Sequence, residues 1–178
     1  MAEATGTYTF ADLWQRAAMF WKNSRNPGSD DVELLKDVVN DAYSRFLSAH
    51  DWTFASPTAQ ITTTANQDSD PLPDNFGELA ADFAYASAEN QSILMTERTS
   101  EWIEQMQGAN GAPTGSPMFF AVEPSTLVAA TGQRWRVMWY PTPNDAFTFN
   151  YRFEINHIKM VTDAEYPLGG TRHSYTIY

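Results

Sequence analysis

The sequence predicts an α+β protein in which an N-terminal antiparallel helix pair joins an antiparallel β-rich domain. Three observations lead to this class: apolar residues recur at helical spacing before residue 50, β-branched residues follow Trp52, and apolar and polar residues alternate between 135 and 155. We expect a helical part at 1–50, a mixed β-rich part with a short helix and a C-terminal hairpin at 51–155, and an extended tail at 156–178. At 178 residues, these parts are expected to form one structural unit.

The first predicted helix has a clear start and a clear end. Thr9 is placed to cap it, and Asp12, three residues later, completes a capping box. Asn26-Pro27-Gly28 breaks the helical pattern. The predicted buried face contains Phe10, Leu13, Trp14, Ala17, Phe20 and Trp21.

A second helix follows after this short break, and a short break favours an antiparallel pair. Ser29, Asp30 and Asp31 are expected to cap it, because acidic side chains favour the positive end of the helix dipole. Its predicted apolar stripe contains Val32, Leu35, Val38, Val39, Ala42, Tyr43, Phe46 and Leu47.

The middle of the chain gives weaker signals. The β-branched run 60–64 predicts a strand, and two prolines within 70–74 predict a loop. Further predictions follow in chain order: a helical turn at 75–79, a hairpin formed by 82–88 and 92–98 or else a helix there, a helix at 100–107, a loop at 108–117 and a strand at 118–122.

The strongest β signal lies in two adjacent runs. Trp135, Val137 and Trp139 alternate with polar or charged residues, and the same alternation returns from Phe147 to Ile155. A period of two over neighbouring runs predicts two paired strands with one buried face, joined across 141–145.

Charge and composition exclude several function classes. The net charge is −11, and residues 51–107 hold ten acidic residues against one base, Arg98. Such a surface repels phosphate and disfavours tight nucleic-acid binding. The absence of cysteine excludes disulfides, thiolate metal sites and a cysteine nucleophile. No leader pattern or membrane-length apolar run is present, so we expect no membrane association and synthesis in a cytoplasm.

Residues that could carry chemistry are few. His50, His157 and His173 show no metal-binding spacing, and no phosphate-binding or nucleophile motif is present. Asp68, Asp70 and Asp74 lack the glycine and closing glutamate of a calcium loop, so a solvated acidic turn is favoured. Glu101 and Glu104 fit a helix start better than an acid–base pair. We therefore expect no enzyme, no cofactor and no metal.

A basic face on the predicted hairpin is a candidate interface. Arg134, Arg136 and Arg152 are expected to share one face, where they could contact phosphate or an acidic neighbour. We favour the acidic neighbour, because a subunit with a basic face and an acidic flank can pair head to tail. The full set of candidate interface residues is Arg134, Arg136, Arg152, Arg172, Tyr175, Ile177 and Tyr178.

The order of these features resembles the head-to-tail adaptors of tailed bacteriophages, also called connector, neck or tail-tubular adaptor proteins. The resemblance runs from the helix pair, through His50-Asp51-Trp52 and a Leu72-Pro73-Asp74-Asn75-Phe76 step, to the later strands. Its most specific part is Tyr-Pro-x-Pro-x-x-Ala-x-Thr-x-x-Tyr at 140–151. It also includes the helix start Ser100-Glu101-Trp102 and the strand that ends Met118-Phe119-Phe120-Ala121-Val122.

The resemblance implies a virion structural protein that catalyses no reaction. It implies a homo-oligomeric ring, usually of twelve copies, in the neck of the virion, with the portal on one side and a tail or nozzle protein on the other. DNA would pass through the lumen without sequence-specific binding. The tip 171–178 would reach the portal, and strand addition is a physical route for such a contact.

Two other functions stay open at this point. A tail terminator or stopper ring would share the ring arrangement but face the tail. A carbohydrate- or ligand-binding β module would use the Trp135/Trp139 pair for stacking, and it requires both tryptophans to be exposed.

Overall fold

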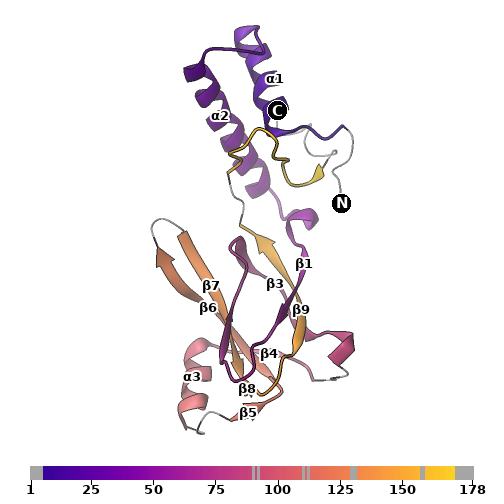
Figure 1. The fold of residues 1–178 in the computed structure, drawn as a ribbon, viewed down its shortest axis with the longest axis vertical. Helices are drawn as coiled ribbons and strands as arrows, with labels where there is room; N and C mark the ends of the chain where they lie inside the picture. The colour runs from indigo at the N-terminus through magenta and orange to yellow at the C-terminus, as the bar shows by residue number, and fades with distance from the viewer. Residues whose placement is uncertain are drawn as a thin grey trace. The chain divides into compact units, whose positions relative to one another are not determined.

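The structure, a computed structural model, describes residues 6–89, 91, 93–109, 111, 113–128, 132–156 and 159–170. Contacts divide the chain into two units (Figure 1). The helical unit takes in the described residues of Met1–Ala55 and His157–Tyr178, and the β unit is Ser56–Asn156. An N-terminal helix pair followed by mostly antiparallel sheets confirms the predicted α+β class.

The helix pair begins as the sequence predicts. Helix α1 spans Phe10–Lys22, and the Thr9 hydroxyl accepts a hydrogen bond of 3.2 Å from the Asp12 amide. The Asp12 carboxylate accepts one of 3.0 Å from the Thr9 amide, which completes the predicted capping box. Asn23, at φ 53°, takes the left-handed conformation that ends the helix.

Helix α2 spans Ser29–Ser48 and differs from the prediction at its start. Its N-cap is Gly28, without a side-chain hydrogen bond, and the predicted capping residues lie in the first turn instead. There Asp30 and Asp31 still complement the helix dipole. The core of the helical unit contains Phe10, Leu13, Trp14, Ala18, Leu35, Val39, Tyr43 and Met160.

Residues 159–170 are fastened to this helix pair. The side-chain amide of Asn40 donates to the Met160 carbonyl at 3.0 Å and accepts from the Met160 amide at 2.9 Å. The Tyr43 hydroxyl accepts from the Leu168 amide at 2.9 Å. The first amides of α1 donate to the carbonyls of Glu165 and Asp163, so this segment satisfies helix donors that would otherwise lack a partner.

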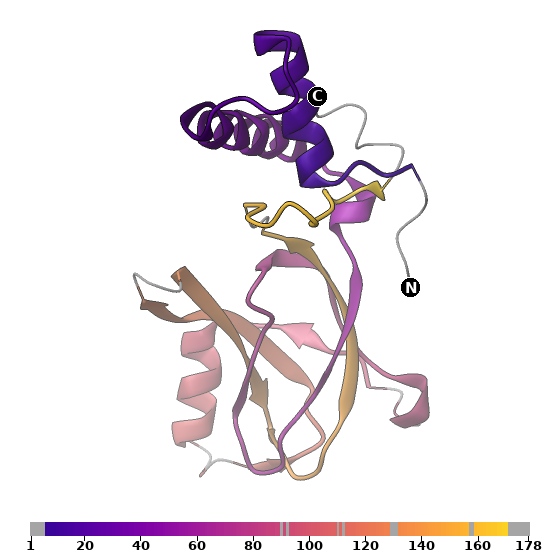
Figure 2. The same cartoon turned by 45° about the horizontal axis from the view of Figure 1, so that its top comes forward.

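The β unit contains a three-stranded sheet, a four-stranded sheet and one short strand pair (Figure 2). The three-stranded sheet has the order β1 (Thr58–Thr62), β9 (Thr148–Ile155), β3 (Phe76–Tyr85). The four-stranded sheet has the order β2 (Ser69–Pro71), β7 (Gly132–Tyr140), β6 (Phe119–Val128), β4 (Thr96–Glu97). The short pair is β5 (Thr114–Gly115) with β8 (Thr142–Pro143), and two 3-10 turns lie at Thr53–Ala55 and Ser87–Glu89.

The predicted pairing of the two alternating runs with each other is wrong. β7 and β9 are both strands, but they belong to different sheets, and β7 pairs with β6 while β9 pairs with β1 and β3. Their apolar sides meet face to face: the Trp139 and Phe149 rings stack 4.8 Å apart. Alternation identifies a strand with one buried face, but it does not distinguish a neighbour in the same sheet from one in the facing sheet.

Other middle elements were also placed differently. The predicted helical turn at 75–79 is wrong, because β3 begins at Phe76. The predicted hairpin over 82–98 reduces to one isolated bridge between Ala84 and Leu94, and β4 pairs in parallel with β6. The strands near 60–64 and 118–122 and the helix from Ser100 are confirmed.

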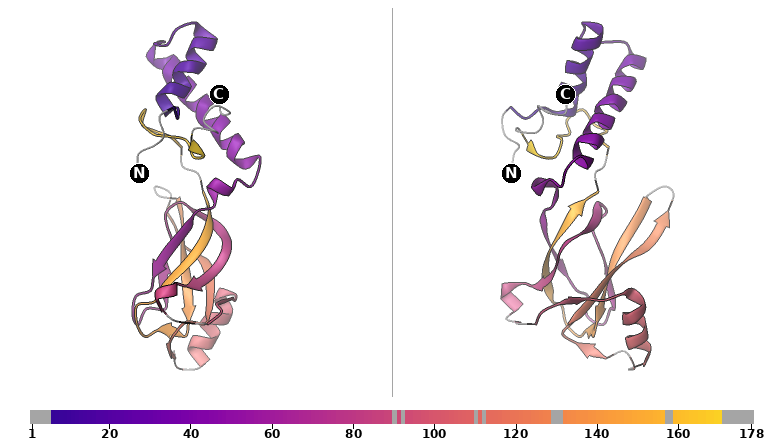
Figure 3. Two further views of the ribbon diagram at one scale, coloured as in Figure 1. Left: turned by 90° about the vertical axis from the view of Figure 1, so that its right-hand side faces the viewer. Right: turned by 180° about the vertical axis from the view of Figure 1, so that it is seen from behind.

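Aromatic side chains fill the space between the two larger sheets. Phe83 lies at the centre, with its ring 4.8 Å from Tyr151, 4.9 Å from Phe120 and 5.2 Å from Trp139. Helix α3 (Ser100–Ala109) covers the other face of the four-stranded sheet through buried Ile103. β6 and β7 form a hairpin that extends beyond the short strands β2 and β4 on its two sides (Figure 3).

Candidate assembly surface

An apolar groove runs along the helical unit between α1 and α2. Its volume is about 670 Å³. The groove exists because only part of the apolar side of each helix packs against the other helix. The groove is lined by Leu13, Ala17, Phe20, Trp21, Leu34, Leu35, Val38, Val39 and Ala42.

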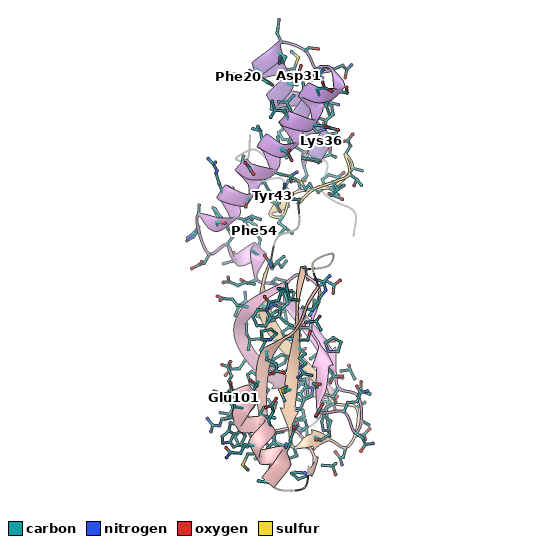
Figure 4. All side chains as sticks on the ribbon, turned by 90° about the vertical axis from the view of Figure 1, so that its left-hand side faces the viewer. Phe20, Asp31, Lys36, Tyr43, Phe54 and Glu101 are labelled. Carbon is teal, nitrogen blue, oxygen red and sulfur yellow. The ribbon has the colours of Figure 1, made fainter. Side chains whose placement is uncertain are left out.

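The rims of this groove are unusually exposed for apolar side chains. Phe20, labelled on α1 in Figure 4, is 94% exposed. Trp21, Leu34 and Val38 are each half exposed, and Met19 is 40% exposed. A contiguous apolar patch of this kind typically marks a surface that contacts another protein.

The sequence prediction had placed Phe20, Trp21 and Val38 in the core of the helix pair. The structure leaves them on the surface, because two helices bury only the sides that face each other. One signal could have shown this. Met19, Phe20 and Trp21 are consecutive apolar residues, and since neighbours on a helix differ by about 100° in direction, they do not all face one core.

Charged residues of opposite sign lie beside the exposed apolar residues of the two helices. On α1, Arg16 shares a stripe with Met19 and Phe20 at spacings of three and four. On α2, Asp37 and Asp41 share a stripe with the groove residues Leu34 and Val38. The exposed side of α1 is therefore basic and apolar, whereas that of α2 is acidic and apolar.

Three ion pairs hold charged residues in the described part of the helical unit. Lys159 Nζ lies 3.8 Å from Asp37 Oδ1, which connects residues 159–170 to α2. Lys22 Nζ lies 3.2 Å from Asp31 Oδ1, which connects the end of α1 to the start of α2. Lys36 Nζ lies 2.7 Å from Asp163 Oδ1, and the Trp14 indole donates to the same oxygen at 3.2 Å. These contacts hold the pKa of the Asp163 carboxyl below its usual range.

The predicted interface arginines are divided between the two sheets. Arg134 Nε lies 3.1 Å from Asp74 Oδ1, and Arg136 Nε donates to Glu123 Oε1 at 2.6 Å on the neighbouring strand. Arg152, on β9, donates to the Ser56 carbonyl at 3.1 Å.

Arg152 therefore does not share a face with the other two, and that part of the prediction is wrong. Arg134 and Arg136 lie on the side of β7 opposite to Val137 and Trp139, whereas Arg152 lies on the outer side of the three-stranded sheet. Their role in an interface stays a prediction. The other predicted interface residues, Arg172, Tyr175, Ile177 and Tyr178, lie outside the described residues.

The acidic turn expected from Asp68, Asp70 and Asp74 is only partly a solvated one. Asp70 is 5% exposed, and its carboxylate accepts hydrogen bonds from the Trp139 indole at 2.8 Å and the Thr64 hydroxyl at 3.1 Å. Asp70 is therefore a structural residue of the β unit, because it satisfies two donors at the sheet edge.

The described part of the chain offers little for ligand or metal chemistry. It holds no group of three or more His, Asp or Glu residues that could bind a metal ion. The His50 and Trp52 rings meet edge to face with their centroids 5.1 Å apart, and the other two histidines lie outside the described residues. Trp139 is fully buried and Trp135 is partly buried, so the exposed tryptophan pair that a ligand-binding module requires is not present.

The family model described as SU10 adaptor protein matches residues 8–169, which cover both the helical and the β unit. A search of curated proteins found no match. Among the described residues, no helix combines the length and apolar character needed to cross a membrane.

Proposed function

Because the chain belongs to the SU10 adaptor protein family, we propose that it is the head-to-tail adaptor of a tailed bacteriophage. In this proposal it forms a homo-oligomeric ring, of twelve copies, in the neck of the virion. The portal protein lies on one side of the ring and a tail or nozzle protein on the other. Synthesis would take place in the cytoplasm of the host bacterium.

The family match is the observation that carries this proposal, because it extends over almost the whole chain. The apolar groove of the helical unit supports a role in assembly, because contact with another subunit would remove exposed apolar side chains such as Phe20 from water. The net charge of −11 suits a protein beside a DNA channel, because an acidic surface repels phosphate and lets DNA slide past.

The role proposed here is structural rather than catalytic. The family is one of phage adaptors. The arginines at 134, 136 and 152 and the tip residues at 172, 175, 177 and 178 remain proposed contacts with neighbouring proteins. Strand addition by the tip is the proposed route of portal binding, because an extended segment can pair with a free sheet edge.

Binding of the purified chain to the isolated portal ring of the same phage tests the proposal. Mass measurement and particle images would read the number and position of added copies. Addition of a ring with the symmetry of the portal supports the adaptor function. Capping of isolated tail tubes without portal binding would instead show a tail terminator, and binding to neither would overturn the proposal.

A further inference from the structure

We infer that neighbouring copies contact each other head to tail through the helical unit, with α1 of one copy seated in the α1–α2 groove of the next. This inference rests on the proposed function, because it assigns the contact that would build the ring. It starts from two different exposed stripes, Arg16/Met19/Phe20 on α1 and Leu34/Val38 beside Asp37 and Asp41 on α2.

The exposed apolar side chains of these helices supply part of the area that a contact between copies needs. Phe20 and Trp21 together expose on the order of 300 Å² at their exposed fractions, since an aromatic side chain presents about 150–250 Å². A standard interface covers about 800 Å² on each partner, a little over half of it apolar. In the proposed contact this area is divided between the partners, because Met19 and Phe20 of one copy meet Trp21, Leu34 and Val38 in the groove of the next.

The position of the two stripes leaves both of them accessible for a head-to-tail contact. Trp14 and Ala18 face the core, so the Arg16/Met19/Phe20 stripe lies off the buried side of α1. In α2, Val39 and Tyr43 face the core, so the Leu34/Val38 stripe likewise lies off its buried side. When the two surfaces of a contact differ, a copy that uses one surface for one neighbour still has the other surface available for a second neighbour. Such a contact repeats from copy to copy and forms a ring if the rotation closes.

Charge complementarity favours a contact between α1 of one copy and α2 of another over a contact between two α2 stripes. α2 contains five acidic and two basic residues, whereas α1 contains one acidic and two basic residues. A dimer that faced two α2 stripes would bring Asp37 and Asp41 against their own copies. A contact of α1 with α2 instead brings Arg16 of one copy, whose guanidinium lies 3.8 Å from its own Tyr8 ring, toward these carboxylates of the next. Asp41 is the nearer match, because Asp37 already lies 3.8 Å from Lys159 of its own chain.

A mixing experiment on the full chain separates the two stripes. Met19→Asp places a charge on the Arg16/Met19/Phe20 stripe of α1 without altering a groove residue, and Val38→Asp places one in the groove. Each variant alone should self-associate tenfold or more weakly in analytical ultracentrifugation, because an unpaired carboxylate would be buried in the contact. An equal mixture should form dimers, because the intact α1 stripe of the Val38→Asp chain then meets the intact groove of the Met19→Asp chain. Leu94→Asp, at a residue 88% exposed in the β unit, is the matched control and should associate like the wild type.

Cross-linking provides a second readout that also detects a weak contact, because the chain has no cysteine of its own. A mixture of Met19→Cys and Val38→Cys chains should yield the mixed disulfide dimer in excess over either homodimer. It should also exceed the yield from Met19→Cys with Leu94→Cys. Circular dichroism of every variant checks that the helices remain folded.

The outcomes separate the inference from the proposed function. If both aspartate variants associate like the wild type, or the mixed disulfide shows no excess, the inference is wrong even when rings form on the portal. If the mixture restores no dimers while both variants are defective, the two stripes do not meet and the inference is wrong. If the wild type associates no further than a dimer, a symmetric contact replaces the head-to-tail one, because a head-to-tail contact continues from copy to copy. If the mixture dimerises but the wild type ignores the portal, the inference holds and the adaptor function fails.

Discussion

The indole N–H of Trp139 donates a hydrogen bond of 2.8 Å to the Oδ2 atom of Asp70, and both side chains are buried. The bond connects the edge strand β2 to the central strand β7 and places a carboxylate beside an aromatic core. We expect Asp70→Ala to lower the free energy of unfolding of the β unit by about 1–3 kcal/mol, because the indole loses its acceptor. Urea unfolding followed by tryptophan fluorescence measures it. Asp68→Ala, at an exposed neighbour, should change stability by no more than about 0.5 kcal/mol; equal losses would contradict this role.

Asn40→Ala should release residues 159–170 from the helix pair. The buried Asn40 amide makes two hydrogen bonds to the Met160 backbone, and their loss leaves a buried backbone donor and acceptor without partners. We expect a cost of about 1–3 kcal/mol and faster hydrogen exchange at the Met160 amide. The exposed Asn26→Ala is the matched control. Unchanged exchange at Met160 in the Asn40 variant would show that the clamp does not depend on this side chain.

The helical unit should lose stability in acid. The Lys36 ammonium, and then the Trp14 indole, lower the pKa of the Asp163 carboxyl, and the Val161 amide lowers the pKa of the Glu165 carboxyl. A lowered folded-state pKa contributes stability above the unfolded-state value of about 4, and this stability is lost as the pH falls through the folded-state pKa. In thermal unfolding followed by circular dichroism, the wild type should therefore lose stability more steeply below about pH 4 than the Asp163→Asn/Glu165→Gln variant. Because Asp163 is 53% exposed, added salt should reduce the difference; parallel pH profiles would contradict the prediction.

Charge reversal of Arg134 and Arg136 tests the proposed basic contact face. Arg134→Glu/Arg136→Glu should weaken ring assembly on the portal, because the face would repel the acidic flank of its neighbour. Both arginines also pair within the chain, with Asp74 and Glu123, so the folding of the variant is checked by circular dichroism. The swap Arg136→Glu/Glu123→Arg keeps one pair on the same two strands and serves as the control. Normal assembly of the double reversal would exclude these arginines as ring contacts.

Removal of residues 171–178 tests the proposed portal contact of the tip. The shortened chain retains residues 159–170, which carry the contacts to α1 and α2, so its melting temperature should match that of the full chain within a few degrees. Its binding to the portal ring should fall by tenfold or more in a sedimentation assay. A shortened chain that melts normally and binds the portal as tightly as the full chain would place the contact elsewhere.

The sequence predicted what depends on local pattern and missed what depends on distant partners. Helical periodicity and the Thr9–Asp12 capping box lie within a few residues, so α1 was predicted with its correct start. The choice of strand partners was not local: the alternation around Trp139 and Phe149 showed two buried faces but not that they belong to facing sheets. The burial of Asp70 depends on an indole 69 positions later. The groove was missed because apolar helical stripes look alike whether the helix pair or a neighbouring molecule covers them.

The insertion of the β unit between the two parts of the helical unit has a consequence for synthesis. Both helices leave the ribosome before the β unit, but the segment that satisfies the first amides of α1 and clamps Asn40 comes last. All residues of the β unit have emerged once Asn156 is made, whereas the helical unit is complete only when residues 159–170 follow. A chain that terminates before residue 159 therefore lacks the partners of the first α1 amides and of Asn40, and we expect its helical unit to be the less stable part.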